Sequence, residues 1–127
     1  MFCPCNPSIL YIECCGKVHQ SIFSAKRAEQ LMRSRYSAFV LDNMNFLKLS
    51  HATISVNSFD FKSVSKWTKK VNWLKLDILS INNGEEFDDN GYVEFKAYFL
   101  ENRKVDFIHG KSRFIKQANH WVYLDEL

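Results

Sequence analysis

All four cysteines of this 127-residue chain lie within its first fifteen residues, as Cys3, Cys5, Cys14 and Cys15. A Zn²⁺ ion takes four ligands in a tetrahedron, and two close pairs of thiolates joined by a short loop can supply them. The spacing therefore predicts a small zinc-binding knuckle, with these four cysteines as metal ligands and Zn²⁺ as the cofactor.

Other uses of the four thiols are weaker hypotheses. Two disulfides could form in three connectivities, but adjacent cysteines rarely pair with each other. The spacing matches neither ferredoxin pattern for an iron–sulfur cluster. His19 could replace one cysteine as a ligand, although we expect a solvent-exposed histidine there.

Two further residues, Glu94 and His109, fall on neighbouring predicted strands and could form a proton-transfer pair. The alternation of the strands places Glu94 on the wetter face, whereas His109 is expected to point inward. A single histidine on an apolar face is more often a hydrogen-bonded core residue than a catalyst. We therefore assign no catalytic residue, and Glu94 and His109 remain candidates.

Candidate ligand-binding residues are spread along the body of the chain: Arg33, Arg35, Trp73, His109, Arg113 and Trp121. Arg33 and Arg35 could hold an acidic ligand. We favour a structural role in which they anchor the sheet through an acidic residue such as Asp125. The two tryptophans are expected in a cavity wall or in the core.

Hydrophobic periodicity predicts helices before strands. Residues 17–23 are expected to be a connector, and an amphipathic helix should follow, capped by Ser24, with its apolar side chains on one face. Asp42 is expected to cap a second helix, and residues 60–71 should form a third.

The second half of the chain has strand periodicity. In residues 72–81, Leu74, Leu76 and Ile78 should face inward, and strict alternation continues over residues 91–100. A loop rich in Asn, Gly and acidic residues separates these segments, and further strands are expected near residues 105–116 and 121–125. This order predicts an α+β fold with an antiparallel sheet, divided into a knuckle at residues 1–20 and a main domain at residues 21–127.

These residues carry two resemblances. The pattern C-x-C-x8-C-C, with Tyr11 and Glu13 before the last pair, resembles the SEC-C motif, a zinc-binding module that contacts a partner chaperone in a translocase ATPase. The chain departs from that motif at Asn6-Pro7-Ser8, where Gly-Ser-Gly is usual.

The second resemblance covers nearly the whole chain. The segments LMRSRYSAFV (31–40), WLKLDIL (73–79), GYVEFKAYF (91–99), HGKSRFIK (109–116) and HWVYLD (120–125) are similar to the YchJ-like family of uncharacterised bacterial proteins. The resemblance implies a nuclear transport factor 2-like cone, in which helices lie against a bent antiparallel sheet and enclose a pocket. Gly110 stands where many members carry Glu, and the second, C-terminal knuckle of some members is missing.

Composition limits the function classes. The net charge is +3, from 17 basic and 14 acidic residues mixed along the chain, so a nucleic-acid role is not expected. Such a role would depend on Lys17, His19, Lys26, Arg27 and Arg33. No apolar stretch approaches the ~18 residues of a membrane span, and no signal peptide is visible, so a cytoplasmic location is expected.

The expected function is non-enzymatic binding. The knuckle would contact a protein partner, the cone would hold a small apolar or acidic ligand, and the exposed sheet would allow a homodimer. The alternative is a small acid–base enzyme, of isomerase or dehydratase type, that uses His109 in the cone.

Overall fold

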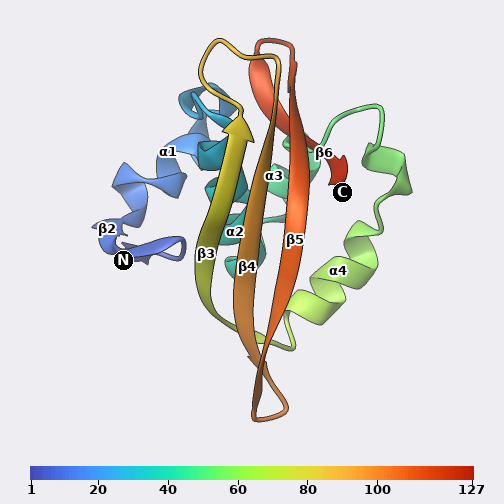
Figure 1. Cartoon of the computed structure of the whole chain (residues 1–127). Coiled ribbons are helices and arrows are strands. Elements are labelled where there is room, and N and C mark those ends of the chain that lie inside the picture. The colour runs from blue at the N-terminus through green and yellow to red at the C-terminus, as the bar shows by residue number, and fades with distance from the viewer.

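The computed structural model describes all residues, Met1–Leu127. Four strands form one antiparallel sheet in the order β3 (Asn72–Asn83), β4 (Asn90–Glu101), β5 (Lys104–Gln117) and β6 (His120–Glu126). Consecutive strands are neighbours throughout, so the sheet is a simple meander. Figure 1 shows the strands in front of helices α2 (Ala28–Val40) and α3 (Met44–Leu49), with α4 (Phe61–Thr68) on one flank. The α+β prediction is confirmed.

Two tight turns join the last three strands. Asn102 and Arg103 have φ angles of 52° and 66°, and Ala118 and Asn119 have φ angles of 50° and 66°. Two consecutive left-handed residues define the type I′ turn, whose twist matches that of the strands it joins. Short turns of this kind align each strand with the next.

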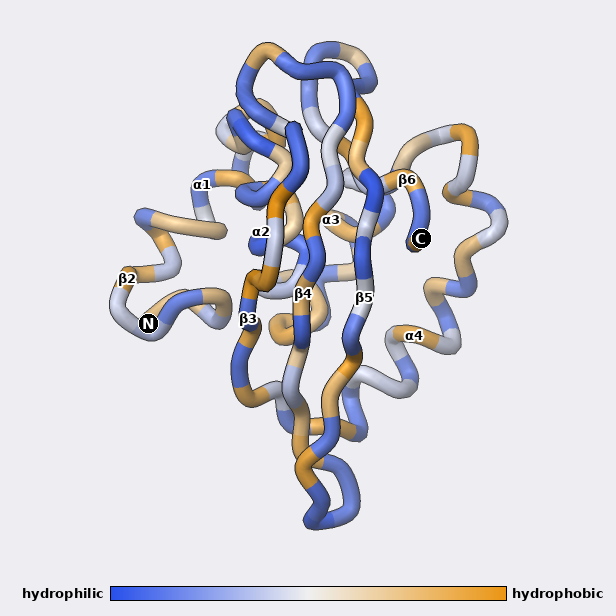
Figure 2. Tube along the Cα trace, viewed as in Figure 1, coloured by the Kyte–Doolittle hydropathy of each residue, from blue (hydrophilic) through white to orange (hydrophobic).

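Strand β4 alternates without interruption between buried and partly exposed residues. Val93, Phe95, Ala97 and Phe99 are buried on the face toward the helices, called the inner face. Tyr92, Glu94, Lys96 and Tyr98 lie on the opposite, outer face. Figure 2 shows the corresponding change of hydropathy along the central strands. The prediction for residues 91–100 is confirmed.

Strand β3 is less regular, because its pairing with β4 shifts between Trp73 and Lys75 and again between Ile78 and Ser80. A bulge inserts a residue and reverses the side-chain alternation that follows it. Leu76 is buried as expected, but Leu74 lies in the first bulge and is 48% exposed. The prediction that Leu74 faces inward is therefore wrong.

Helix α2 is buried on almost every side rather than along the single face we expected. It packs against the sheet on one side and against α1 (Cys15–Gln20) on the other. A helix enclosed in this way can bury small polar residues as well as apolar ones, and Ser34 and Ser37 are fully buried.

The helix starts differ from the expected caps. Gln30 Oε1 accepts hydrogen bonds from the backbone N–H groups of Lys26 and Arg27, so α2 begins at Ala28 and Ser24 is not its cap. Asn43, not Asp42, caps α3 by accepting from Phe46 N. Helix α4 starts as expected, with Asp60 as its cap, but it ends at Thr68 instead of near residue 71.

The N-terminal segment contains a small hairpin, β1 (Phe2–Cys3) and β2 (Asn6–Leu10), followed by the 3₁₀ turn η1 (Tyr11–Glu13) and by α1. The predicted connector at 17–23 is wrong at its start, since α1 extends to Gln20 and the 3₁₀ turn η2 (Ile22–Ser24) follows. Another 3₁₀ turn, η3 (Val56–Ser58), precedes α4.

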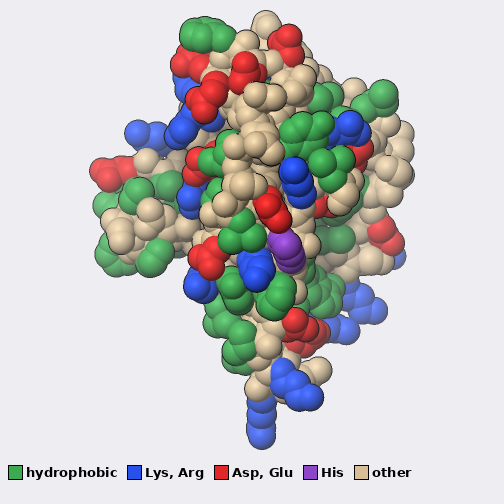
Figure 3. Space-filling view, viewed as in Figure 1, with side chains coloured by type: hydrophobic (Ala, Val, Ile, Leu, Met, Phe, Trp, Pro, Cys, Tyr) green, Lys and Arg blue, Asp and Glu red, His purple; other side chains and the backbone are tan.

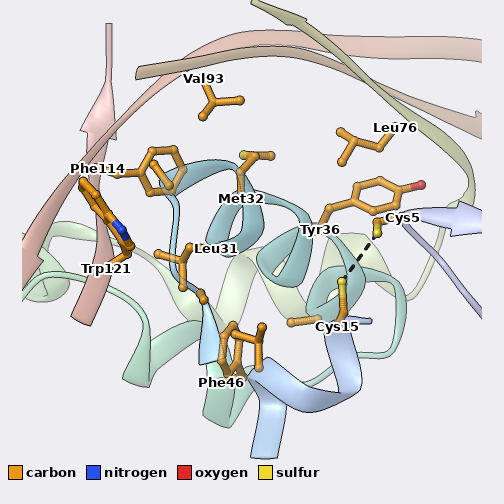
Figure 4. Close-up of a cluster of buried hydrophobic side chains, with 14 of the residues drawn as sticks. Cys5, Cys15, Leu31, Met32, Tyr36, Phe46, Leu76, Val93, Phe114 and Trp121 are labelled. Carbon is orange, nitrogen blue, oxygen red and sulfur yellow. Dashed lines mark hydrogen bonds between the residues drawn. The ribbon is translucent and has the colours of Figure 1, made fainter. Parts of the chain in front are cut away.

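One hydrophobic core of 19 buried residues connects these parts. Figure 4 shows Leu31 and Met32 of α2 between sheet residues such as Val93 and Phe114 and the cysteines of the N-terminal segment. No helix is long and apolar enough to cross a membrane.

Candidate functional site: a cysteine cluster and an aromatic cavity

The four cysteine sulfurs lie together, all within 4.8 Å of one another. Cys5 Sγ is at the centre, 3.7 Å from Cys3 Sγ and 3.6 Å from the sulfurs of Cys14 and Cys15. Four thiolates around a tetrahedral metal with M–S bonds of ~2.3 Å are separated by ~3.8 Å. The cluster therefore has the spacing that a tetrahedral metal ion requires.

The cluster is held by local structure. The β1–β2 hairpin carries the first pair of cysteines, and the second pair stands at the start of α1. Directly after the second pair, Gly16 packs so closely that a Cβ atom there would lie 2.6 Å from the carbonyl oxygen of Tyr11. A glycine is thus required where η1 turns into α1.

The ionisation of these thiols fits a metal site. The hydrogen bond between the Cys5 thiol and Cys15, with burial second, raises the pKa of Cys5 far above its usual range. Burial raises the pKa of Cys14 to about 12. Burial also acts to raise the pKa of Cys3, but hydrogen bonds from the N–H groups of Cys5 and Cys15 lower it to about 7. The cluster cannot carry four thiolate charges unaided, whereas a bound cation deprotonates coordinating thiols.

His19 is not part of the cluster. Its Nδ1 meets the hydroxyl of Tyr11 and its Nε2 lies 2.7 Å from the carbonyl oxygen of Ser34. The ring is half-buried, so the expectation of a solvent-exposed histidine is wrong. It links η1 to α2 and supports the segment that carries the second cysteine pair.

The Asn6-Pro7 departure is accommodated in extended backbone. Both residues belong to β2, and Asn6 does not have a positive φ. Its Oδ1 accepts a hydrogen bond from Ser8 N, at 3.0 Å. The residue before a proline favours extended geometry, so the hairpin replaces a glycine turn with an extended strand.

A second feature is a cavity of about 440 Å³ between the inner face of the sheet and the helices. Its volume lies in the range of ~300–1,000 Å³ typical of small-molecule sites. Aromatic residues dominate its walls: Tyr36, Phe39, Phe59, Trp67, Trp73, Phe95 and Tyr123. This is the pocket that the cone fold implies.

Three of the predicted ligand-binding residues, Arg35, Trp73 and His109, line this cavity. Trp73 Nε1 donates to Thr68 Oγ1, at 2.8 Å, which fixes the ring. Trp121 is fully buried in the core and donates to the carbonyl of Lys26. The tryptophans therefore have the positions expected of them, one in the wall and one in the core.

The arginines are arranged differently from expectation. Asp125 pairs with Arg113 in a two-pronged contact, at 2.9 Å and 2.6 Å. Arg33 pairs with Glu29 on its own helix, and Arg35 forms no ion pair at all. The predicted anchoring of Arg33 or Arg35 through Asp125 is thus wrong. Arg33 and Arg113 do not line the cavity.

His109 and Glu94 do meet, with Nε2 2.8 Å from the carboxylate. They meet on the outer face, because His109 pairs with Lys96 across the strands. Hydrogen bonds from His109 and Ser80 lower the pKa of Glu94. His109 borders the cavity, but its ring points outward and its side chain is 47% exposed. The expectation of an inward-pointing His109 is wrong, because Val105 and Phe107, which share its face, are exposed too.

The sequence did not single out Ser112 and Glu126, which line the cavity and are joined by a hydrogen bond. No local pattern marks them, since strand pairing alone brings β5 and β6 together here. On the outer face, Figure 3 shows basic, acidic and hydrophobic side chains interspersed. No block of basic side chains dominates this face.

Together, the fold and the cysteine cluster define a class: a nuclear transport factor 2-like domain with an N-terminal SEC-C-type cysteine knuckle. The family model for the middle, nuclear transport factor 2-like domain of YchJ matches residues 27–126. The chain belongs to the YchJ-like family, which includes the UPF0225 proteins.

Similar proteins in other bacteria support this assignment to the family. A UPF0225 protein of Photorhabdus laumondii is 37% identical over 126 residues, covering 97% of this chain and 78% of its own length. One from Vibrio cholerae is 34% identical over 125 residues, covering 98% and 82%.

Two solved structures of SEC-C motif proteins are similar over the whole fold. The solution structure from Rhodopseudomonas palustris has a TM-score of 0.87 at 27% identity and covers 100% of this chain and 98% of its own. The crystal structure from Psychrobacter arcticus has a TM-score of 0.82 at 30% identity, covering 98% and 81%.

Proposed function

We propose that this protein is a zinc-dependent binding module, whose knuckle contacts a protein partner and whose cone holds a small ligand. The observation that carries the metal part is the set of three sulfur–sulfur distances of 3.6–3.7 Å around Cys5. Thiolates favour zinc over hard cations such as Mg²⁺ and Ca²⁺.

Zinc here has a structural role. Four protein ligands fill a tetrahedral coordination sphere and leave no position for substrate or water. Three of the cysteines, Cys3, Cys5 and Cys15, belong to the core shared with the cone. The ion would therefore hold the N-terminal segment against α2. Thiolates persist in a reducing compartment, which supports a cytoplasmic location.

The test is metal content together with thiol titration of the purified protein. We expect about one zinc per chain, lost in Cys14→Ser and in Cys15→Ser and retained in Ser8→Ala, a matched change in the same segment. Wild-type protein purified without zinc and with four titratable thiols would overturn the proposal. Finding iron instead of zinc would change the identity of the metal, but the four cysteines would still be its site.

The partner surface proposed for the knuckle consists of exposed apolar side chains beside the metal site. Phe2 and Ile12 are 63% and 70% exposed, and both belong to the segment that carries the cysteines, so they would supply apolar contacts to a partner there. The test compares the proteins bound by wild type and by Phe2→Ser/Ile12→Ser, followed by binding of the purified candidate. Loss of one directly binding protein in the variant supports the surface. Self-association that the variant abolishes would instead identify a second copy of this chain as the partner.

The acid–base alternative places His109 in the cavity. The ring is hydrogen-bonded to Glu94 on the outer face instead, which favours binding over catalysis by this residue. His109→Gln should leave ligand binding in the cavity unchanged, as measured by titration of the tryptophan fluorescence. A large loss of affinity would support the alternative.

A further inference from the structure

Arg35 is a buried cation that forms no direct ion pair. Its residue is 4% exposed, yet none of the ion pairs in the protein includes it. Burial lowers its pKa to about 10, and the fields of Tyr123 and of the Glu126 carboxylate oppose this effect. The side chain is therefore still charged at neutral pH. A buried charge is normally compensated by an opposite charge.

Only one end of the guanidinium group is used by the protein. Nη1 donates to the carbonyl oxygen of Leu47, at 2.9 Å, and to Ser50 Oγ, at 2.7 Å. Nε and Nη2 make no hydrogen bond. These two nitrogens are not fully enclosed either. The protein has one fully enclosed side-chain polar atom without a hydrogen-bond partner, and it is Nδ1 of His51. The free donors thus keep accessible surface, on a side chain that lines the cavity.

The free donors have a specific geometry. The N–H groups on Nε and Nη2 are parallel and lie on one edge of the planar guanidinium, and this edge matches the two oxygens of a carboxylate. Contact with Tyr123 holds the plane in place, since Arg35 Cζ lies 4.6 Å from the ring centroid. The fork is consequently preorganised for a bidentate anion.

The rest of the cavity limits the ligand to a monoanion with an apolar body. Arg35 is the only Lys or Arg in the lining, and Glu126 is the only Asp or Glu. A dianion such as a phosphate ester would leave charge uncompensated and would be repelled by Glu126. The remaining walls, with Trp67 and Trp73 packed edge-to-face at 5.6 Å, offer faces and edges on which an aromatic ring can pack.

We propose that the cavity binds a small aromatic monocarboxylate, whose carboxylate pairs with Nε and Nη2 of Arg35 and whose ring packs between Trp67, Trp73 and their aromatic neighbours. This assignment rests on the proposed ligand-binding role of the cone and names the chemical class of the ligand. Glu126 lies in the same cavity, held by Ser112 Oγ, and weakens the binding of any anion.

The experiment titrates the zinc-loaded 127-residue chain with benzoate, 3-phenylpropionate and indole-3-propionate. Binding is followed by the amide resonances of cavity residues and by calorimetric heats. The matched probes are 3-phenylpropionamide, which lacks the charge, and phenyl phosphate, which has a higher charge. At least one acid should bind, with the amide and the phosphate weaker by about tenfold or more, as expected for loss of a charge-assisted bidentate pair.

Substitutions separate the contributions of Arg35 and Glu126 to the affinity for the acid. Arg35→Lys should weaken binding of the acid by about tenfold, because an ammonium lacks the fork, and Glu126→Gln should strengthen it several-fold. Glu126→Gln keeps the proposal testable if Arg35 variants fail to fold. Arg113→Lys, on the outer face, is the matched control and should leave affinity unchanged.

Two outcomes overturn the inference at different levels. Equal binding of the acid and the amide by wild type removes the carboxylate assignment and leaves the cone as an uncharged-ligand site. Absence of any shift with all three acids and with the amide removes both the carboxylate and the ligand-binding role of the cone. The zinc proposal is independent of either result.

Discussion

Cys3 Sγ lies 3.6 Å from the hydroxyl oxygen of Ser37, which is fully buried in the middle of α2. This contact joins the cysteine cluster to the central helix of the cone. The knuckle is therefore packed into the main domain, and its consequences extend beyond the N-terminal segment.

Loss of the metal should destabilise the cone as well as the knuckle. Cys3, Cys5 and Cys15 belong to one core with residues of α2 and the sheet. We expect chelation, or Cys15→Ser, to lower the free energy of unfolding by at least about 2 kcal/mol, since metal binding energy contributes to folding energy. Thermal unfolding followed by tryptophan fluorescence measures this, because all three tryptophans lie outside the knuckle. An unchanged transition in metal-free protein would show that the knuckle is separable.

Gly16→Ala should damage the knuckle specifically. The added Cβ would lie 2.6 Å from the backbone oxygen of Tyr11, and backbone cannot move away as a side chain can. We expect a loss of about 1–3 kcal/mol in stability and weaker retention of zinc against a competing chelator. Lys17→Ala, at the next and exposed position of α1, is the control. Equal zinc retention in the two variants would contradict the prediction.

His51 should make the protein acid-sensitive. Burial, followed by the charge of Arg35, lowers its pKa from 6.5 to about 4. Because the folded-state pKa is below the unfolded value, the unfolded chain binds more protons between these pH values. The stability from this residue is complete above pH 6.5 and is lost as the pH falls toward 4. The difference between the folded-state and unfolded-state pKa of His51 corresponds to roughly 3 kcal/mol of folding stability.

The measurement is urea unfolding of wild type and His51→Phe across this pH range. His51 packs against Phe59, at 5.2 Å between ring centroids, so a phenyl ring suits the site. The variant should lose less stability on acidification than wild type. Phe59→Leu, which disturbs packing and keeps the imidazole, should retain the wild-type slope. Parallel pH profiles for wild type and His51→Phe would exclude His51 as the source.

Because of the bulge in β3, truncating Leu74 and truncating Leu76 should cost different amounts of folding stability. Leu76 is 8% exposed and packs in the core, whereas Leu74 is 48% exposed. We expect Leu76→Ala to cost about 2–4 kcal/mol and Leu74→Ala less than about 1 kcal/mol. Chemical denaturation of both variants tests this. Similar losses would mean that β3 keeps the regular alternation that its sequence predicts.

The sequence by itself determined the features that depend on near neighbours in the chain. The C-x-C and C-C spacing identified the cysteines, helical periodicity located α2 and α4, and strict alternation located β4. Motif resemblance added the family and the cone, which the family model and the solved structures confirm.

Tertiary structure alone decided the rest, because it depends on residues far apart in the chain. The bulge that exposes Leu74 arises from pairing with β4, and the side on which His109 points follows from which face of the sheet the helices cover. Arg35 forms no ion pair in the cavity because Leu47 and Ser50 satisfy one edge of its guanidinium while Asp125 pairs with Arg113. Periodicity states that a residue lies on a face, but only packing determines what that face meets.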